Sequence, residues 1–289
     1  GKKTFQAENP AKGRALADLY PVSSWQDCDD ALDAAASAAE ILREMPGEHL
    51  ASFLECYASR IEDRKDDLVA MAHLETALPV SPRLADVELP RTVNQLRLGA
   101  AAARDGGWTL PTIDTKTNIR SMLAPMGPVA VFGPNNFPFA FNSIAGGDFA
   151  AAVAAANPVI AKANSSHPGT TRLFAEEAEA ASLACEMPPG TVQLIYRTSH
   201  ADGEKLVADP RMGAIGYTGS RHAGLKLKAA ADAAGNPIYL ELSSVNPVIL
   251  LPGALHERMG EIAQQFTTSC LMGTGQFCTN PGLVILLKN

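Results

Sequence analysis

Cys278 lies in the glycine-rich stretch GTGQFCTNPG, residues 273–282. Backbone N–H groups in such a stretch favour a thiolate and could bind a developing oxyanion, so Cys278 is a candidate nucleophile. The alternative is a small apolar residue in a turn, because free cysteine mostly behaves as a small hydrophobe. The six histidines show no Cys/His or metal-ligand pattern, so we expect neither a papain-like site nor a metal.

Two further side chains could assist a nucleophile. Glu241 lies in the apolar stretch YLELSSVNP, where a carboxylate must be paired or have a raised pKa, and a raised pKa suits a general base near neutral pH. The alternative is a simple ion pair between Glu241 and a lysine. Asn136, within GPNNFPF, could stabilise an oxyanion through its amide, or it could cap the helix that follows.

Other residues could hold a nucleotide. Lys162 follows the apolar stretch PVIA, and the stretch GSRHAG places Gly219 and Gly224 around Ser220. Backbone N–H groups at a helix N-terminus can bind a pyrophosphate, with Ser220 donating from its hydroxyl, while Lys162 could contact ribose hydroxyls or a phosphate. The alternatives are a solvated lysine and a plain tight turn, because the three-glycine dinucleotide fingerprint is absent.

The elements that must position these residues alternate along the chain. Residues 27–98 show helical periodicity, and residues 106–127 are expected to form an extended hairpin arm. Short apolar strands then alternate with helices, which predicts an α/β fold with a mostly parallel sheet. The expected strands are 128–132, 158–162, 191–196, 214–219 and 237–242, and 246–252 and 282–288 begin a second alternation. Ligands of open α/β sheets bind outside the carboxyl ends of the strands, where these candidates lie.

The composition excludes several classes of protein. The chain has 289 residues, a net charge of −7 and a pI near 5.4, which argues against a nucleic-acid binder. It has no apolar run of about 20 residues and no signal-peptide pattern, so we expect no membrane association. The five cysteines lack metal-type spacing and predict reduced thiols in a cytoplasmic protein, the four other than Cys278 being buried.

Together these stretches resemble the aldehyde dehydrogenase superfamily. GPNNFPFAF is similar to its Asn-Phe-Pro segment, VIAKANSSHPGT to its ribose-binding strand and loop, and GYTGSRHAG to its pyrophosphate turn. YLELSSVNP and GTGQFCTNPG are similar to its glutamate and cysteine motifs, and they look most like the NADP-using enzymes for 2-oxoglutarate semialdehyde. The resemblance implies that Cys278 attacks the aldehyde, that Asn136 and the N–H of Cys278 hold the oxyanion, and that Glu241 activates the water that releases the acid.

The resemblance also implies a dinucleotide site. Relatives that prefer NAD commonly carry a glutamate three residues after the lysine, and Ser165 stands there. Without that carboxylate a 2′-phosphate is not repelled, so we expect NADP, with NAD as the alternative. Arg197 could add a second positive charge. The expected cofactor-binding residues are Phe132, Pro134, Lys162, Ser165, Arg197, Gly219, Ser220, Gly224 and Leu242.

The resemblance divides the chain into three parts. Residues 1–107 and 123–242 are expected to form an NAD(P)-binding domain of Rossmann-like type, residues 108–122 an oligomerisation arm, and residues 243–289 the start of a second, α/β catalytic domain. Full enzymes of the family are longer, so this fold looks truncated. The arm implies a homodimer or homotetramer, and the alternative is a hairpin packed on its own chain.

One departure from the family pattern leaves the activity open. Ser243 stands where the glutamate motif usually has glycine. Other interpretations are a fatty or other aliphatic aldehyde dehydrogenase of the same subgroup, and a catalytically silent nucleotide-binding fragment.

Overall fold

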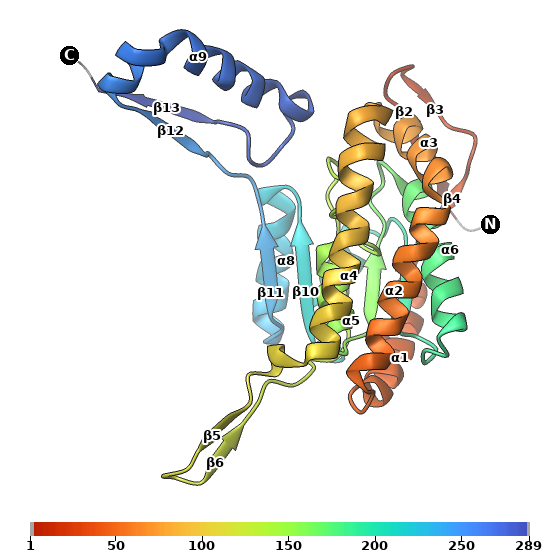
Figure 1. Ribbon diagram of the computed structural model, residues 1–289. Helices are drawn as coiled ribbons and strands as arrows, with labels where there is room; N and C mark the ends of the chain where they lie inside the picture. The colour runs from red at the N-terminus through yellow and green to blue at the C-terminus, as the bar shows by residue number, and fades with distance from the viewer. Residues whose placement is uncertain (1–2, 288–289) are drawn as a thin grey trace. The chain divides into compact units, whose positions relative to one another are not determined.

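The computed structural model describes residues 3–287 and divides into two compact units, Gly1–Leu240 and Glu241–Asn289. The first unit carries a five-stranded sheet with strand order β11-β10-β7-β8-β9, and its strands β10 and β11 lie side by side in Figure 1. The second carries a separate two-stranded sheet. The assignment of the expected segments as functional domains stays a prediction.

The sheet of the first unit has the expected α/β pattern. Its strands are β7 (Val129–Phe132), β8 (Val159–Lys162), β9 (Val192–Ile195), β10 (Ala214–Thr218) and β11 (Ile238–Glu241). The three pairs β10–β7, β7–β8 and β8–β9 are parallel. The chain runs outward from β7 to β9 and then crosses back to β10 on the other side of β7. That reversal is a topological switch point, the usual place for a ligand in an open α/β sheet.

Helices cover this sheet. They are α1 (Trp25–Leu42), α2 (Gly47–Asp63), α3 (Lys65–Thr76), α4 (Leu89–Asp105), α5 (Gly147–Ala154), α6 (Pro168–Ala184), α7 (His200–Val207) and α8 (Arg221–Ala234). The segment predicted as helical, 27–98, contains α1 to α3, the π-helix η1 (Val80–Glu88) and the start of α4. Helices α2 and α4 lie side by side and pack on α5 (Figure 1). Their apolar faces form the main core, with Phe53, Tyr57 and Phe149 fully buried.

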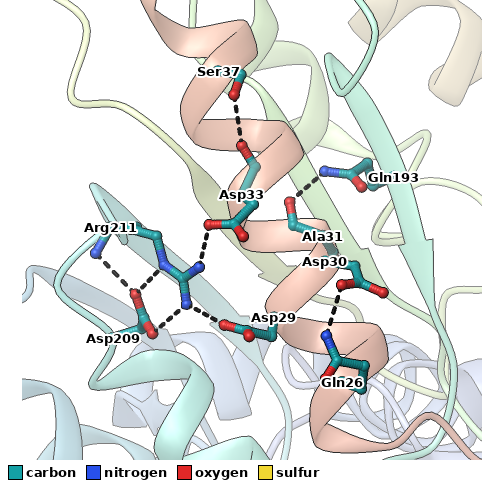
Figure 2. Close-up of polar contacts among 9 residues, drawn as sticks. All are labelled: Gln26, Asp29, Asp30, Ala31, Asp33, Ser37, Gln193, Asp209 and Arg211. Carbon is teal, nitrogen blue, oxygen red and sulfur yellow. Dashed lines mark hydrogen bonds and ion pairs between the residues drawn. The ribbon is translucent and has the colours of Figure 1, made fainter.

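One arginine fastens α1 to the turn before β10. The Arg211 guanidinium donates to Asp29 at 2.6 Å, to Asp33 at 2.5 Å and to Asp209 at 2.8 Å (Figure 2). On the same helix, the Gln193 side chain of β9 donates to the carbonyl oxygen of Ala31 at 2.5 Å. Polar contacts thus hold α1 against strand β9 and against the turn before β10, both of which are distant from α1 in sequence.

The expected hairpin is present. Strands β5 (Thr112–Asp114) and β6 (Ile119–Ser121) pair antiparallel, and all six residues are exposed. Four short strands near the N-terminus form two further antiparallel pairs: β1 (Thr4–Phe5), β2 (Glu8–Asn9), β3 (Arg14–Ala15) and β4 (Tyr20–Pro21).

The second unit is one strand–helix–strand repeat. Strands β12 (Pro247–Leu250) and β13 (Leu283–Leu286) pair in parallel, and α9 (Pro252–Leu271) connects them, followed by the short helix η3 (Met272–Gly275). The second alternation expected from the sequence is therefore confirmed.

Two properties bear on the class of protein. Among the helices of residues 3–287, none has the length and apolarity needed to cross a membrane. The expectation that four cysteines are buried was wrong in part. Only Cys28 is buried, whereas Cys56, Cys185 and Cys270 are half-buried and Cys278 is exposed; none of the five thiols forms a disulfide.

Candidate active site

A cleft of about 460 Å³ lies at the carboxyl ends of four strands of the first unit. Its wall includes Pro134 after β7, Ser165 after β8, Arg197 after β9 and Gly219 after β10. It spans the topological switch point between β7 and β10, where doubly wound sheets bind nucleotides. The expected cofactor residues in its wall are Phe132, Pro134, Lys162, Ser165, Arg197, Gly219 and Ser220.

Two positive charges, those of Lys162 and Arg197, meet in this cleft, whose wall also includes the carboxylate of Glu204. Lys162 is half-buried at the end of β8, so the expected alternative of a freely solvated lysine is wrong. Burial, and then repulsion from Arg197, lowers the pKa of Lys162. Neither side chain forms an ion pair within residues 3–287; Arg197 instead lies 5.1 Å from the centre of the Phe5 ring. This arrangement favours an anionic ligand.

The turn after β10 has the geometry of an anion-binding helix start. Ser220 is the N-cap of α8, and its hydroxyl accepts from the N–H of Ala223 at 3.4 Å. The remaining first-turn N–H groups and the positive end of the helix dipole are available to a phosphate. Gly224 is buried in α8 and does not line the cleft, and Leu242 lies in the second unit. The structure therefore does not place Gly224 with the other expected residues, and the role of Leu242 stays a prediction.

The loops after β7 and β8 are fastened to each other. The Asn164 side chain donates to the carbonyl oxygen of Gly133 at 3.1 Å. His167 is 1% exposed, and its Nε2 lies 2.9 Å from the carbonyl oxygen of Pro134. Burial lowers the pKa of His167, which favours a neutral ring that donates from Nε2. The wall of the cleft is thus held by side chains outside the expected set.

A buried carboxylate also supports the loop after β8. Glu75 of α3 is 3% exposed and accepts from the N–H groups of Gly169 at 2.7 Å and Thr170 at 2.8 Å. These are first-turn donors of α6, the helix that follows the loop of Ser165, and the carboxylate acts as their cap. Burial nevertheless raises the pKa of Glu75 to about 7.

The loop carrying Asn136 is anchored by residues of η1. Arg83 donates to the carbonyl oxygen of Asn136 at 2.8 Å and forms an ion pair of 3.1 Å with Glu88. Glu88 is 1% exposed, and its Oε1 accepts from the N–H groups of Phe139 at 2.8 Å and Ala140 at 3.0 Å. Burial raises the pKa of Glu88, against the opposing effect of Arg83.

Asn136 does not cap the next helix, as one interpretation of the sequence allowed. The N-cap of α5 is Gly146, ten residues further along the chain. The backbone groups of the loop before α5 form turns and hydrogen bonds to Glu88, so α5 begins only at Gly147. Sequence reasoning missed Arg83 and Glu88, although Glu75 and Glu88 each interrupt an apolar helical stretch, which is a detectable signal.

In the second unit, one segment links the candidate base and nucleophile. Asn246 donates to the carbonyl oxygens of Cys278 and Asn280, the latter at 2.9 Å, and Ser244 donates to the carbonyl oxygen of Cys278. Glu241 ends β11, three residues before Ser244, and is exposed. The ion pair between Glu241 and a lysine, which was the alternative to a general base, is not found within residues 3–287. Cys278 is exposed and precedes β13.

The aldehyde dehydrogenase family model matches residues 1–289. The chain belongs to the aldehyde dehydrogenase family. Its relatives include alpha-ketoglutaric semialdehyde dehydrogenase 2 of Azospirillum brasilense, 42% identical over 296 residues, and the alpha-ketoglutaric semialdehyde dehydrogenase of Acinetobacter baylyi, 38% identical over 297 residues. These alignments cover 98% and 99% of this chain and 56% of each relative. The chain therefore spans little more than half the length of these aldehyde dehydrogenases.

Solved aldehyde dehydrogenases share the fold. A mutant of aldehyde dehydrogenase C from Pseudomonas syringae, in a complex with NAD+ and octanal, superposes with a TM-score of 0.87 at 23% identity. The superposition covers 100% of this chain and 56% of that chain. An NAD+ complex of the aldehyde dehydrogenase from Bacillus cereus gives 0.84 at 23% identity. At these identities the likeness establishes the fold, so the roles of individual site residues stay predictions.

Proposed function

We propose that this protein oxidises an aldehyde, 2-oxoglutarate semialdehyde, to the carboxylic acid with NADP+ as the oxidant. The observation that carries the proposal is that expected cofactor residues following four different strands line one cleft. Support for the substrate comes from the two relatives at 42% and 38% identity, both named for alpha-ketoglutaric semialdehyde. The cleft fits a dinucleotide phosphate, because Lys162 and Arg197 meet there with no carboxylate paired to either within the described residues.

In this mechanism the Cys278 thiolate attacks the aldehyde carbon and forms a thiohemiacetal. The Asn136 amide and the backbone N–H of Cys278 donate to its oxyanion. When bound, NADP+ accepts the hydride, which leaves a thioester on Cys278. Glu241 removes a proton from water, the resulting hydroxide attacks the thioester, and the acid departs with the Cys278 thiolate as leaving group.

The preference for NADP+ rests on the loop after β8. Ser165 lines the cleft three residues after Lys162, where it presents a hydroxyl. A hydroxyl does not repel a 2′-phosphate, and the two neighbouring cations attract it. The family uses NAD(P), and the choice of NADP+ is part of the proposal.

The experiment compares Glu241→Gln with Cys278→Ala, following NADPH absorbance after mixing with NADP+ and 2-oxoglutarate semialdehyde. The unaltered protein should turn over steadily. Glu241→Gln should keep a burst of about one NADPH per site while steady turnover collapses, because only thioester hydrolysis needs the base. Cys278→Ala should abolish the burst, whereas the control Cys270→Ala, which changes another free thiol of the same unit, should retain it.

Two results would overturn this assignment. A burst and a turnover that fall together in Glu241→Gln would remove Glu241 from deacylation. NADP+ binding without any NADPH formation by the unaltered protein would favour a silent nucleotide-binding chain. Faster turnover of an uncharged fatty aldehyde than of the semialdehyde would instead favour the aliphatic aldehyde alternative.

A further inference from the structure

Two arginines of neighbouring helices hold their guanidinium groups over phenylalanines of the Asn136 loop. The Cζ atom of Arg83, in η1, lies 4.4 Å from the centre of the Phe137 ring. The Cζ atom of Arg91, in α4, lies 5.0 Å from the ring centre of Phe141 and 6.0 Å from that of Phe137. The two rings meet edge to face, with centroids 5.0 Å apart. Asn136, the candidate oxyanion donor, immediately precedes Phe137.

These two cations differ in what they bind. Arg83 is 13% exposed, forms an ion pair with Glu88 and donates to the carbonyl oxygen of Asn136, so it is part of the anchor of the loop. Arg91 is exposed, and no carboxylate within residues 3–287 lies at ion-pair distance from it. Glu88, which pairs with Arg83, also interacts electrostatically with Arg91, and its Oε1 already accepts from two backbone N–H groups. Two guanidinium groups and one carboxylate leave one positive charge in excess beside Asn136.

We propose that Arg91 binds the carboxylate of the aldehyde substrate, at the end remote from the aldehyde group. This inference rests on the proposed function, because it takes Asn136 as the donor to the substrate oxygen. A guanidinium presents paired donors that match a carboxylate, and its flat face remains in contact with the aromatic rings while its edge binds. The substrate class is therefore an ω-oxo acid, a short chain with an aldehyde at one end and a carboxylate at the other.

The test measures kcat and KM of Arg91→Met with 2-oxoglutarate semialdehyde and with pentanal, which has the same number of carbons and no carboxylate. A hydrogen-bonded charge pair predicts a KM for the semialdehyde about tenfold to a hundredfold higher than in the unaltered protein. The kcat/KM for pentanal should stay within about twofold, since its tail carries no charge to lose. Arg91→Lys should restore part of the semialdehyde affinity.

The matched control is Arg97→Met, in the same helix α4, where Arg97 pairs with Glu62 at 2.6 Å. It should leave both substrates unchanged. The proposal is overturned if Arg91→Met changes the two substrates by the same factor, which a general disturbance of the Asn136 loop would do, or if it leaves both unchanged.

A binding measurement separates this proposal from the proposed function. Glutarate, a five-carbon dicarboxylate without an aldehyde, is titrated calorimetrically into the unaltered protein and Arg91→Met. Glutarate bound by the former and at least tenfold more weakly by the latter supports the carboxylate site even if no aldehyde is oxidised. Equal affinity for the two proteins overturns it even if the unaltered protein oxidises aldehydes.

Discussion

The Asn246 side chain donates to the carbonyl oxygen of Cys278, so a residue of the glutamate segment holds the loop of the candidate nucleophile. The same amide also donates to the carbonyl oxygen of Asn280, so it binds the loop at two positions. Asn246 has a φ of +46°, a left-handed conformation that asparagine tolerates better than most residues. The amide and the backbone conformation together explain why asparagine suits this position.

Replacement of Asn246 by glycine removes the amide without straining that φ. We expect Asn246→Gly to slow the burst of NADPH about tenfold or more, because the Cys278 loop loses its fixed geometry, while the Kd for NADP+ stays unchanged. Stopped-flow absorbance and fluorescence titration check the two quantities. Asn94→Ala, at an exposed position of α4, is the control. A weaker NADP+ affinity with an unchanged burst would contradict the assigned role.

A carboxylate placed in the cleft should change the cofactor preference. Ser165→Glu brings a negative charge to the position that lines the cleft beside Lys162. We expect the Kd for NADP+ to rise about tenfold to a hundredfold relative to that for NAD+, through repulsion of the 2′-phosphate. Ser166→Glu is the matched control, because the adjacent Ser166 is exposed and does not line the cleft. If the two variants change the ratio of the Kd for NADP+ to the Kd for NAD+ equally, the 2′-phosphate does not bind beside Ser165.

The buried Glu75 should make stability depend on pH. Its pKa rises from the ordinary 4.5 to about 7, so between these values the folded state binds more protons than the unfolded state. Stability contributed by the protonated carboxyl is therefore present at low pH and falls as pH rises to about 7, by on the order of 3 kcal/mol. Urea denaturation of the unaltered protein and Glu75→Gln, at several pH values from 5 to 8, measures the difference in slope.

The dependence of stability on pH must be compared between the unaltered protein and Glu75→Gln, because other buried groups titrate in the same range. The lowered pKa of His167 acts in the opposite direction, since its unfolded ring binds a proton that the folded ring excludes below about pH 6.5. Glu75→Gln should flatten the fall in stability with pH, and Glu40→Gln, at an exposed position of α1, should not. Parallel slopes for the unaltered protein and Glu75→Gln would show that Glu75 stays charged throughout.

The ion pairs of Arg211 with three aspartates should contribute more to the stability of the fold than those of a similar arginine at the surface. Arg211 contacts three aspartates, of which Asp209 is 10% exposed. We expect Arg211→Met to lower the free energy of unfolding by about 1–2 kcal/mol, since Asp209 would keep a poorly solvated charge. Arg104 pairs with Glu48 and Glu55 through side chains that are 41–63% exposed, and Arg104→Met should lower the free energy of unfolding clearly less. Equal losses in urea denaturation would mean that burial of Asp209 contributes nothing.

The sheet and the location of the candidate residues could be predicted because they depend on local pattern. Short apolar strands at 129–132 and 159–162, each followed by a polar turn, are visible in any window of the sequence. Parallel strands place their carboxyl ends at one edge, so Lys162 and Gly219 meet without further information. The hairpin at 112–121 was predictable for the same reason.

The groups that hold the site could not be predicted in the same way. Glu75 binds the start of a helix 94 residues later, and Glu88 binds a loop 51 residues later. A carboxylate in an apolar helical stretch indicates that a hydrogen-bonding partner is needed, but the sequence does not indicate which backbone groups provide the hydrogen bonds. The helix that follows the Asn136 loop, α5, begins only after Gly146, because the loop first forms turns whose N–H groups Glu88 binds.

The contact between Asp29 and Arg211 joins residues 182 positions apart. During synthesis, α1 leaves the ribosome long before its partner exists, and Asp29 and Asp33 repel each other on neighbouring turns of one helix until then. Docking of α1 therefore belongs late in folding, after the loop between these residues has closed at its entropic cost. A chain stalled before residue 211 would expose the apolar face of α1, the kind of surface that chaperones recognise.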